Sequence, residues 1–121
     1  MMKKLEVGTR SLKEMGADVL EAWKRAETSQ EVVPREALYF ADMPLLLANL
    51  TAARWSLLEA LKASGPMTIY ALAKNLGRNY SNVHSDARKL LALGLIEKNE
   101  DGKVFVPWDE IHADFTLKVA A

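Results

Sequence analysis

The segment RNYSNVHSDARK, residues 78–89, gathers side chains that could make hydrogen bonds to nucleic acid. Asparagine can bond adenine or a phosphate, arginine can fork onto guanine, and serine can bond a base edge or a phosphate. The alternative is an ordinary amphipathic helix whose polar face is only solvated. The faces of that helix, and the elements around it, bear on the choice between the two interpretations.

A helix over residues 80–93 would have two distinct faces, since successive residues are rotated by about 100°. The inner face would carry Tyr80, Val83, Ala87, Leu90 and Leu91. The outer face would carry Ser81, Ser85, Arg88 and Lys89, with Asn82 and His84 on the flanks. Short polar residues near a helix N-terminus allow close approach to base edges, and the nearby Lys74 and Arg78 could hold a phosphate.

The candidate DNA-contacting residues are therefore Lys74, Arg78, Asn79, Tyr80, Ser81, Asn82, His84, Ser85, Arg88, Lys89, Lys98 and Lys103. His84 fits a structural role and a DNA contact equally well, and it lacks a partner for catalysis. We expect Asp86 to hold Arg88 or a neighbouring basic side chain rather than to touch DNA.

Three helices are predicted around this face. Thr51 can cap a helix that runs to Ala63 and stops at Ser64-Gly65-Pro66. Thr68 can cap a shorter helix that ends at Gly77, and Gly94 can end the third. The predicted core of this region is Trp55, Leu58, Leu61, Leu72, Val83, Ala87, Leu90 and Leu95.

A hairpin is predicted after the third helix. Residues 95–99 and 104–107 flank EDGK, and Asp-Gly readily takes the turn conformations that need positive φ. Lys98 and Lys103 could contact phosphate, but Glu100 and Asp101 at the turn would be repelled by it. Helix, helix, helix and hairpin is the order of a winged helix-turn-helix, so we predict a mainly α fold with small β elements (α+β).

The ends of the chain show other patterns. Residues 2–7 could form a strand, residues 11–27 have the apolar spacing of a helix, and residues 37–43 could be strand or loop. A brief helix would follow over residues 45–50, and the tail alternates Phe115, Leu117 and Val119 as a strand would.

The sequence thus predicts an N-terminal extension over 1–50, a DNA-binding domain over 51–107 and a C-terminal strand over 108–121. Unpaired strands invite a partner, so we expect residues 1–30 and 112–120 to build a homodimer.

The composition of the chain excludes several classes of function. The chain has 121 residues with 16 Lys and Arg against 16 Asp and Glu, so any DNA binding must come from local charge. It has no cysteine, which excludes disulfides and thiolate metal sites, and its two histidines, His84 and His112, cannot form a zinc site by themselves. No nucleophile–base pair or phosphate loop indicates an enzyme, and no cofactor is predicted.

The remaining acidic residues and the N-terminus offer no further site. Asp109, Glu110 and Asp114 lack metal-binding spacing and are expected to be solvated. Neither a signal peptide nor a membrane span is indicated, so the chain is expected to be cytoplasmic without a membrane partner.

Residues 50–111 resemble the MarR-like winged-helix transcriptional regulators. They are more closely similar to small regulators and antitoxins often encoded beside a small toxin. The shared motifs are LT-x-x-R, LA-x-x-LGR-x-Y-x-x-VH-x-D-x-x-x-L-x-x-x-GLI and VP-[WY]-[DE]-x-I, with an EAWKRAE-like helix at residues 21–27.

The resemblance implies sequence-specific DNA binding by a dimer on a near-palindromic operator, and a toxin protein as a possible partner. It implies that Arg78, Tyr80, Asn82, His84 and Ser85 lie at the start of the recognition helix. The competing interpretation is a winged helix used only for protein contacts.

Overall fold

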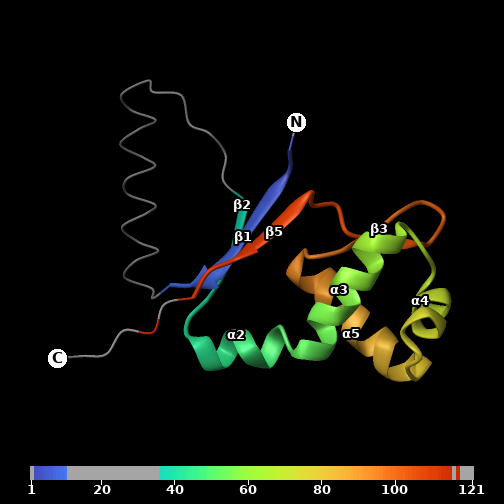
Figure 1. The fold of residues 1–121 in the computed structure, drawn as a ribbon, viewed down its shortest axis with the longest axis horizontal. Helices are drawn as coiled ribbons and strands as arrows, with labels where there is room; N and C mark the ends of the chain where they lie inside the picture. The colour runs from blue at the N-terminus through green and yellow to red at the C-terminus, as the bar shows by residue number, and fades with distance from the viewer. Residues whose placement is uncertain (1, 11–35, 116, 118–121) are drawn as a thin grey trace. The chain divides into compact units, whose positions relative to one another are not determined.

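The computed structural model describes residues 2–10, 36–115 and 117, and it is a mixed α/β structure. Within these residues there are four helices, one three-stranded sheet and one two-stranded sheet (Figure 1). The chain forms two compact units, one from residues 1–3 and 49–109 and the other from residues 4–48 and 110–121. The helix predicted over residues 11–27 lies outside the described residues.

The first unit contains three helices that begin at capping side chains. The helix α3 spans Ala52–Ser64, and the hydroxyl of Thr51 accepts the N–H of Arg54. The helix α4 spans Ile69–Leu76, where Thr68 caps in the same way. The helix α5 spans Tyr80–Leu93, and Asn79 Oδ1 accepts the N–H of Ser81 at 2.8 Å. Each cap satisfies a backbone donor that the helix itself leaves open, so the predicted starts are confirmed.

Glycines end α4 and α5. Gly77 has φ 64° and Gly94 has φ 79°, both in the left-handed region that side chains with a Cβ rarely adopt. Only Gly77, Arg78 and Asn79 separate α4 from α5. A turn of three residues therefore joins the two helices.

The core of this unit lies among the three helices and the hairpin. Its buried apolar side chains are Leu50, Leu57, Leu58, Leu61, Leu72, Ala73, Val83, Ala87, Leu90, Leu95, Ile96, Val104 and Trp108. Seven of the eight predicted core residues are in this set. Trp55 is the exception, because it is half-buried while Leu57 on the same helix is fully buried.

The predicted hairpin is present with shorter strands. The strand β3, Glu97–Lys98, pairs antiparallel with β4, Val104–Phe105. Asn99 Oδ1 accepts the N–H groups of Asp101 and Lys103, both at 3.0 Å, and fixes the turn between the strands. Met67, between α3 and α4, exchanges backbone hydrogen bonds with Val104 at 2.8 and 3.1 Å. Hydrogen bonds thus join the hairpin to the segment between α3 and α4 as well as joining its own two strands.

The second unit is built on a parallel sheet of order β2-β1-β5 (Figure 1). The strand β1 spans Lys4–Thr9, β2 spans Glu36–Phe40 and β5 spans Glu110–Ala113. Leu5 pairs with Ile111, and Val7 pairs with both Leu38 and Ala113, so these apolar residues share one face. The short helix α2, Met43–Asn49, follows β2.

The C-terminal strand differs from the prediction in place and in pairing. It ends at Ala113, so the exposed Phe115 and Leu117 lie beyond it, and Val119 is outside the described residues. It pairs in parallel with β1 of the same chain. The two terminal strands therefore satisfy part of each other's hydrogen-bonding capacity within one molecule, which the sequence patterns had left open.

Leu90 provides a test of this packing. It is fully buried, so Leu90→Ala should lower the free energy of unfolding by about 2–5 kcal/mol through lost contacts and the cavity left behind. Urea unfolding of the full chain, followed by circular dichroism, measures the loss. The neighbouring exposed residue gives the control, since Lys89→Ala should change stability by less than about 0.5 kcal/mol. Equal effects would contradict the observed orientation of α5.

Candidate nucleic-acid interface

The outer face of α5 is open along its length. Val83, Ala87 and Leu90 on the inner face are fully buried. The exposed residues of α5 are the predicted contacts Tyr80, Ser81, Asn82, Ser85, Arg88 and Lys89, together with Ala92. Apart from Tyr80, these predicted residues lie on the outer face of the helix, where their donors and acceptors point to solvent.

Tyr80 differs from its predicted orientation. It was expected on the inner face, but 49% of it is exposed. Its ring centroid lies 6.3 Å from that of Tyr70 on α4 and 5.7 Å from that of the half-buried His84. Because Tyr80 is the first residue of α5, its ring meets the neighbouring helix rather than the core.

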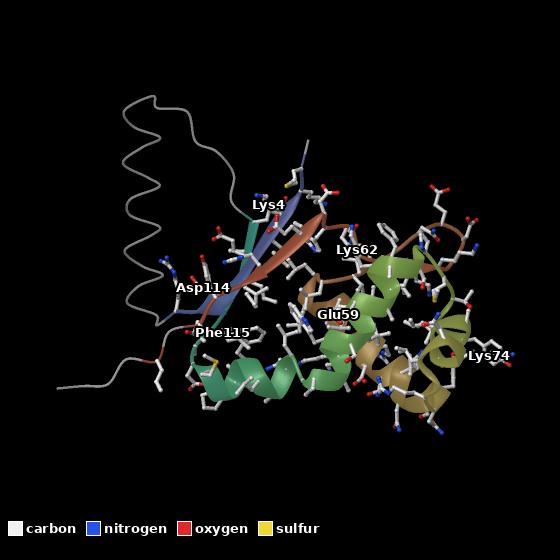
Figure 2. The ribbon with its side chains drawn as sticks, viewed as in Figure 1. Lys4, Glu59, Lys62, Lys74, Asp114 and Phe115 are labelled. Atoms are coloured by element: carbon white, nitrogen blue, oxygen red, sulfur yellow. The ribbon has the colours of Figure 1, made fainter. Side chains whose placement is uncertain are left out.

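Tyr70 is a surface residue that sequence reasoning missed. It is 60% exposed, and the ammonium group of Lys74 lies 5.0 Å from its ring centroid. Tyr70 and Lys74 are four residues apart on α4, a spacing that places side chains on the same helix face. This spacing was the sequence feature from which the pairing of Tyr70 with Lys74 could have been predicted. Figure 2 shows Lys74 extending outward from α4.

Asp86 is the centre of a charged network that joins three segments. Its Oδ1 accepts from Nε of Arg54 at 3.1 Å, and its Oδ2 accepts from Nη2 of Arg78 at 2.8 Å. Arg54 also donates from Nη1 to the carbonyl of Asn49 at 2.8 Å. The start of α3, the α4–α5 turn and the middle of α5 are thereby tied together. Asp86 does hold neighbouring basic side chains, as expected, but the partners are Arg54 and Arg78.

This network changes the interpretation of Arg78. One of its terminal nitrogens is bound to Asp86, and the other, Nη1, is buried without a hydrogen-bond partner among the described residues. The side chain is 30% exposed. Arg78 therefore holds the turn between α4 and α5, and its guanidinium is less available to DNA than those of exposed arginines.

The two arginines stabilise the ionised form of Asp86. Burial of the carboxyl group raises its pKa, but hydrogen bonds and positive charge from Arg78 and Arg54 outweigh this and hold the pKa below its usual value. Asp86 is thus ionised near neutral pH and neutralised by its two partners.

The hairpin lysines form a separate group. Lys98 and Lys103 are exposed, and so are Glu100 and Asp101 in the turn between them. Within the residues that the structure describes, no hydrogen bond or ion pair joins these lysines to α5.

The acidic residues near β5 have basic or backbone partners. Asp109 Oδ2 accepts the backbone N–H of Lys3 at 2.6 Å, and Glu110 lies 3.6 Å from the ammonium group of Lys4. No group of three possible metal ligands occurs within residues 2–10, 36–115 and 117. In the same part of the chain, none of the helices is long and apolar enough to cross a membrane.

A family model described as HVO_A0114 matches residues 49–113, which are more than half of the chain. The chain belongs to the HVO_A0114 family. The match spans α3, α4, α5, both hairpin strands and β5, and so includes the whole Asp86 network. No curated protein and no solved structure matches the chain significantly.

Removing the charge of Asp86 tests the network. Asp86→Asn should lower the free energy of unfolding at pH 7 by about 1–3 kcal/mol, because Arg54 and Arg78 lose their shared counter-charge. The partial exposure of Asp86, 15%, keeps this below the cost for a fully buried pair. The control is the same change at the exposed hairpin turn, Asp101→Asn, which should alter stability by less than about 0.5 kcal/mol.

The same pair of proteins gives a dependence on pH. A pKa that is lowered by folding stabilises the folded state above the unfolded pKa, about 3.9 for Asp, and this contribution is lost as pH falls through the folded value. The stability gap between the native chain and Asp86→Asn should therefore be constant near neutral pH and narrow below about pH 4. A gap that stays unchanged down to acid unfolding would contradict the network's electrostatic origin.

Proposed function

We propose that the chain is a sequence-specific, double-stranded DNA-binding transcriptional regulator of the winged helix-turn-helix type. In this proposal α4 and α5 form the helix-turn-helix, α5 is the recognition helix and β3–β4 is the wing. The observation that carries it is the outer face of α5, which is exposed from Ser81 to Lys89 and presents short polar and basic side chains.

The chemistry of that face suits a major groove. An α-helix fits the groove, and residues near its N-terminal end reach base edges when their side chains are short. Ser81, Asn82 and Ser85 occupy that end and are exposed. Arg88, also exposed and one turn after His84, has the length and donor geometry to fork onto guanine or phosphate.

Local charge supports the same proposal despite the neutral chain. Residues 69–93, from α4 through α5, contain four basic residues and one acidic residue. The acidic residue is Asp86, which Arg54 and Arg78 neutralise. The α4–α5 surface therefore carries net positive charge, as phosphate binding requires. We assign Arg78 to holding this surface in shape, while Lys74, Arg88 and Lys89 supply exposed charge.

Two further parts of the proposal rest on the resemblance and on symmetry. A homodimer would place two recognition helices about 34 Å apart, one turn of DNA, and would require a near-palindromic operator. A cognate toxin as partner, and a location in the cytoplasm, stay predictions from the sequence. The acidic tip of the hairpin, Glu100 and Asp101, argues against insertion of the wing into a minor groove.

Arg88→Ala tests the recognition face. The probe is a duplex selected by the full-length chain from a pool with randomised central base pairs. Loss of a forked contact should weaken binding to this duplex by about 1–3 kcal/mol, as measured by fluorescence anisotropy. The native affinity should also fall steeply as salt concentration rises.

A charge-matched control separates local contact from general electrostatics. Lys4→Ala removes one positive charge from the other unit, where Lys4 is 58% exposed and pairs weakly with Glu110, and it should leave DNA affinity nearly unchanged. Equal losses for Arg88→Ala and Lys4→Ala would remove Arg88 from the base-reading set. Failure of the native chain to select any duplex would favour a winged helix used for protein contacts.

The oligomeric state is tested by mass. The protomer is 13.5 kDa, so size-exclusion chromatography with light scattering should give twice that mass for the full chain at micromolar concentration. Deletion of the terminal segment is a poor test, because residues 112 and 113 belong to β5 and pair with β1. A monomeric mass would contradict the proposed dimer.

A further inference from the structure

Three aromatic side chains form a row across the α4–α5 surface. Tyr70 lies in the first turn of α4, Tyr80 begins α5, and His84 is one helical turn further along α5. Their successive ring centroids are 6.3 and 5.7 Å apart, with the ring planes tilted by 51° and 40°. These are the separations at which aromatic rings attract one another.

Two members of the row, Tyr70 and Tyr80, are exposed, and His84 is half-buried. Tyr70 and Tyr80 are 60% and 49% exposed, whereas Leu72, Ala73 and Val83 on the same two helices are buried. Neither tyrosine hydroxyl forms a hydrogen bond with another described residue. The rings thus leave adjacent apolar area in water, a feature typical of binding surfaces.

Charge around the row selects the kind of occupant. The ammonium group of Lys74 lies over the face of Tyr70 at 5.0 Å, and α4 contains no acidic residue. The only carboxylate of α5 belongs to Asp86, which is occupied by two arginines. An occupant that is apolar where it meets the rings and negatively charged beside Lys74 fits this surface.

DNA presents that combination along each strand. The sugar and the thymine methyl group offer apolar carbon, and the phosphates on either side carry the charge. Tyr80 is also adjacent to Ser81 and Asn82, so a strand read by the start of α5 would pass this row. An acidic peptide shares part of this chemistry but has no equivalent of the regular phosphate spacing.

We propose that the row Tyr70, Tyr80 and His84 is the apolar edge of the DNA interface. Tyr80, with His84 behind it, packs against a thymine methyl group in the major groove and so favours thymine at that position. Tyr70 packs against the sugar of the same strand, and Lys74 binds the adjoining phosphate. This assignment rests on the DNA-binding function proposed above and adds a specificity-determining residue to it.

Deoxyuridine scanning of the selected duplex tests the assignment without altering the protein. Each thymine is replaced in turn by deoxyuridine, which removes the methyl group alone. The native chain should lose about three- to fivefold in affinity at one or two positions, as expected for one buried methyl group. A duplex on which no replacement matters would overturn the role of Tyr80.

Substitutions of the two tyrosines, measured on the same duplexes, show which residue contacts the thymine methyl group. Tyr80→Ala should bind the unmodified duplex at least about fivefold more weakly and should no longer distinguish thymine from deoxyuridine. Tyr80→Phe keeps the ring and should retain both properties. Tyr70→Ala should weaken binding to all duplexes while preserving the preference for thymine. Neither tyrosine belongs to the buried core, so these variants should fold, which circular dichroism checks.

The outcomes separate this inference from the function on which it rests. Normal affinity of both alanine variants, with Arg88→Ala still impaired, would overturn the aromatic edge and leave DNA recognition by α5 standing. Selection of no duplex by the native chain would overturn both. Tyr80-dependent binding of a labelled Glu-Leu repeat peptide, in place of DNA, would assign the row to a protein partner.

Discussion

The bridging of Arg54 and Arg78 by Asp86 is the interaction on which the rest of the candidate site depends. The surface formed by α4 and α5 keeps its shape only if the two helices hold a fixed angle, and only residues 77–79 join them. The carboxylate of Asp86 accepts from both guanidinium groups at 3.1 and 2.8 Å and so links α5 to the turn and to α3. The backbone carbonyl of Asn49 extends the link to the chain before α3.

The same network shapes the electrostatics of the outer surface. Alone, a carboxylate in the middle of α5 would repel phosphate from the face that carries Ser85 and Arg88. Paired with two arginines, it leaves that region positive while the whole chain is neutral. The cost is an arginine, Arg78, whose Nη1 is buried without a partner among the described residues. Arg78 thus fixes the position of the α4–α5 turn, and its charge is less exposed as a result.

Local signals allowed most of the first unit to be predicted. Thr51, Thr68 and Asn79 cap their helices, and Gly77 and Gly94 end them, because capping and left-handed turns depend on residues within a few positions. The side of α5 that is buried followed from its helical period. The parallel pairing of β1 with β5 could not be predicted in this way, because Lys4 and Glu110 lie at opposite ends of the chain and no local pattern encodes their register. Tyr80 was misplaced for a related reason, since its ring meets Tyr70 across a tertiary contact.

Substitutions on the two faces of α5 are expected to have different effects. Val83, Ala87 and Leu90 are fully buried, so changes there alter stability and, through the position of the helix, every property of the outer face. Ser81, Ser85 and Arg88 contact solvent, so changes there should leave the fold intact and would act on the DNA recognition proposed above. Asp86 belongs to neither class, because it is partly exposed and yet holds three segments together. Under the DNA-binding function proposed above, a loss of binding at Asp86 would report on geometry, whereas a loss at Arg88 would report on a contact, and only the second could be assigned to the reading of a base.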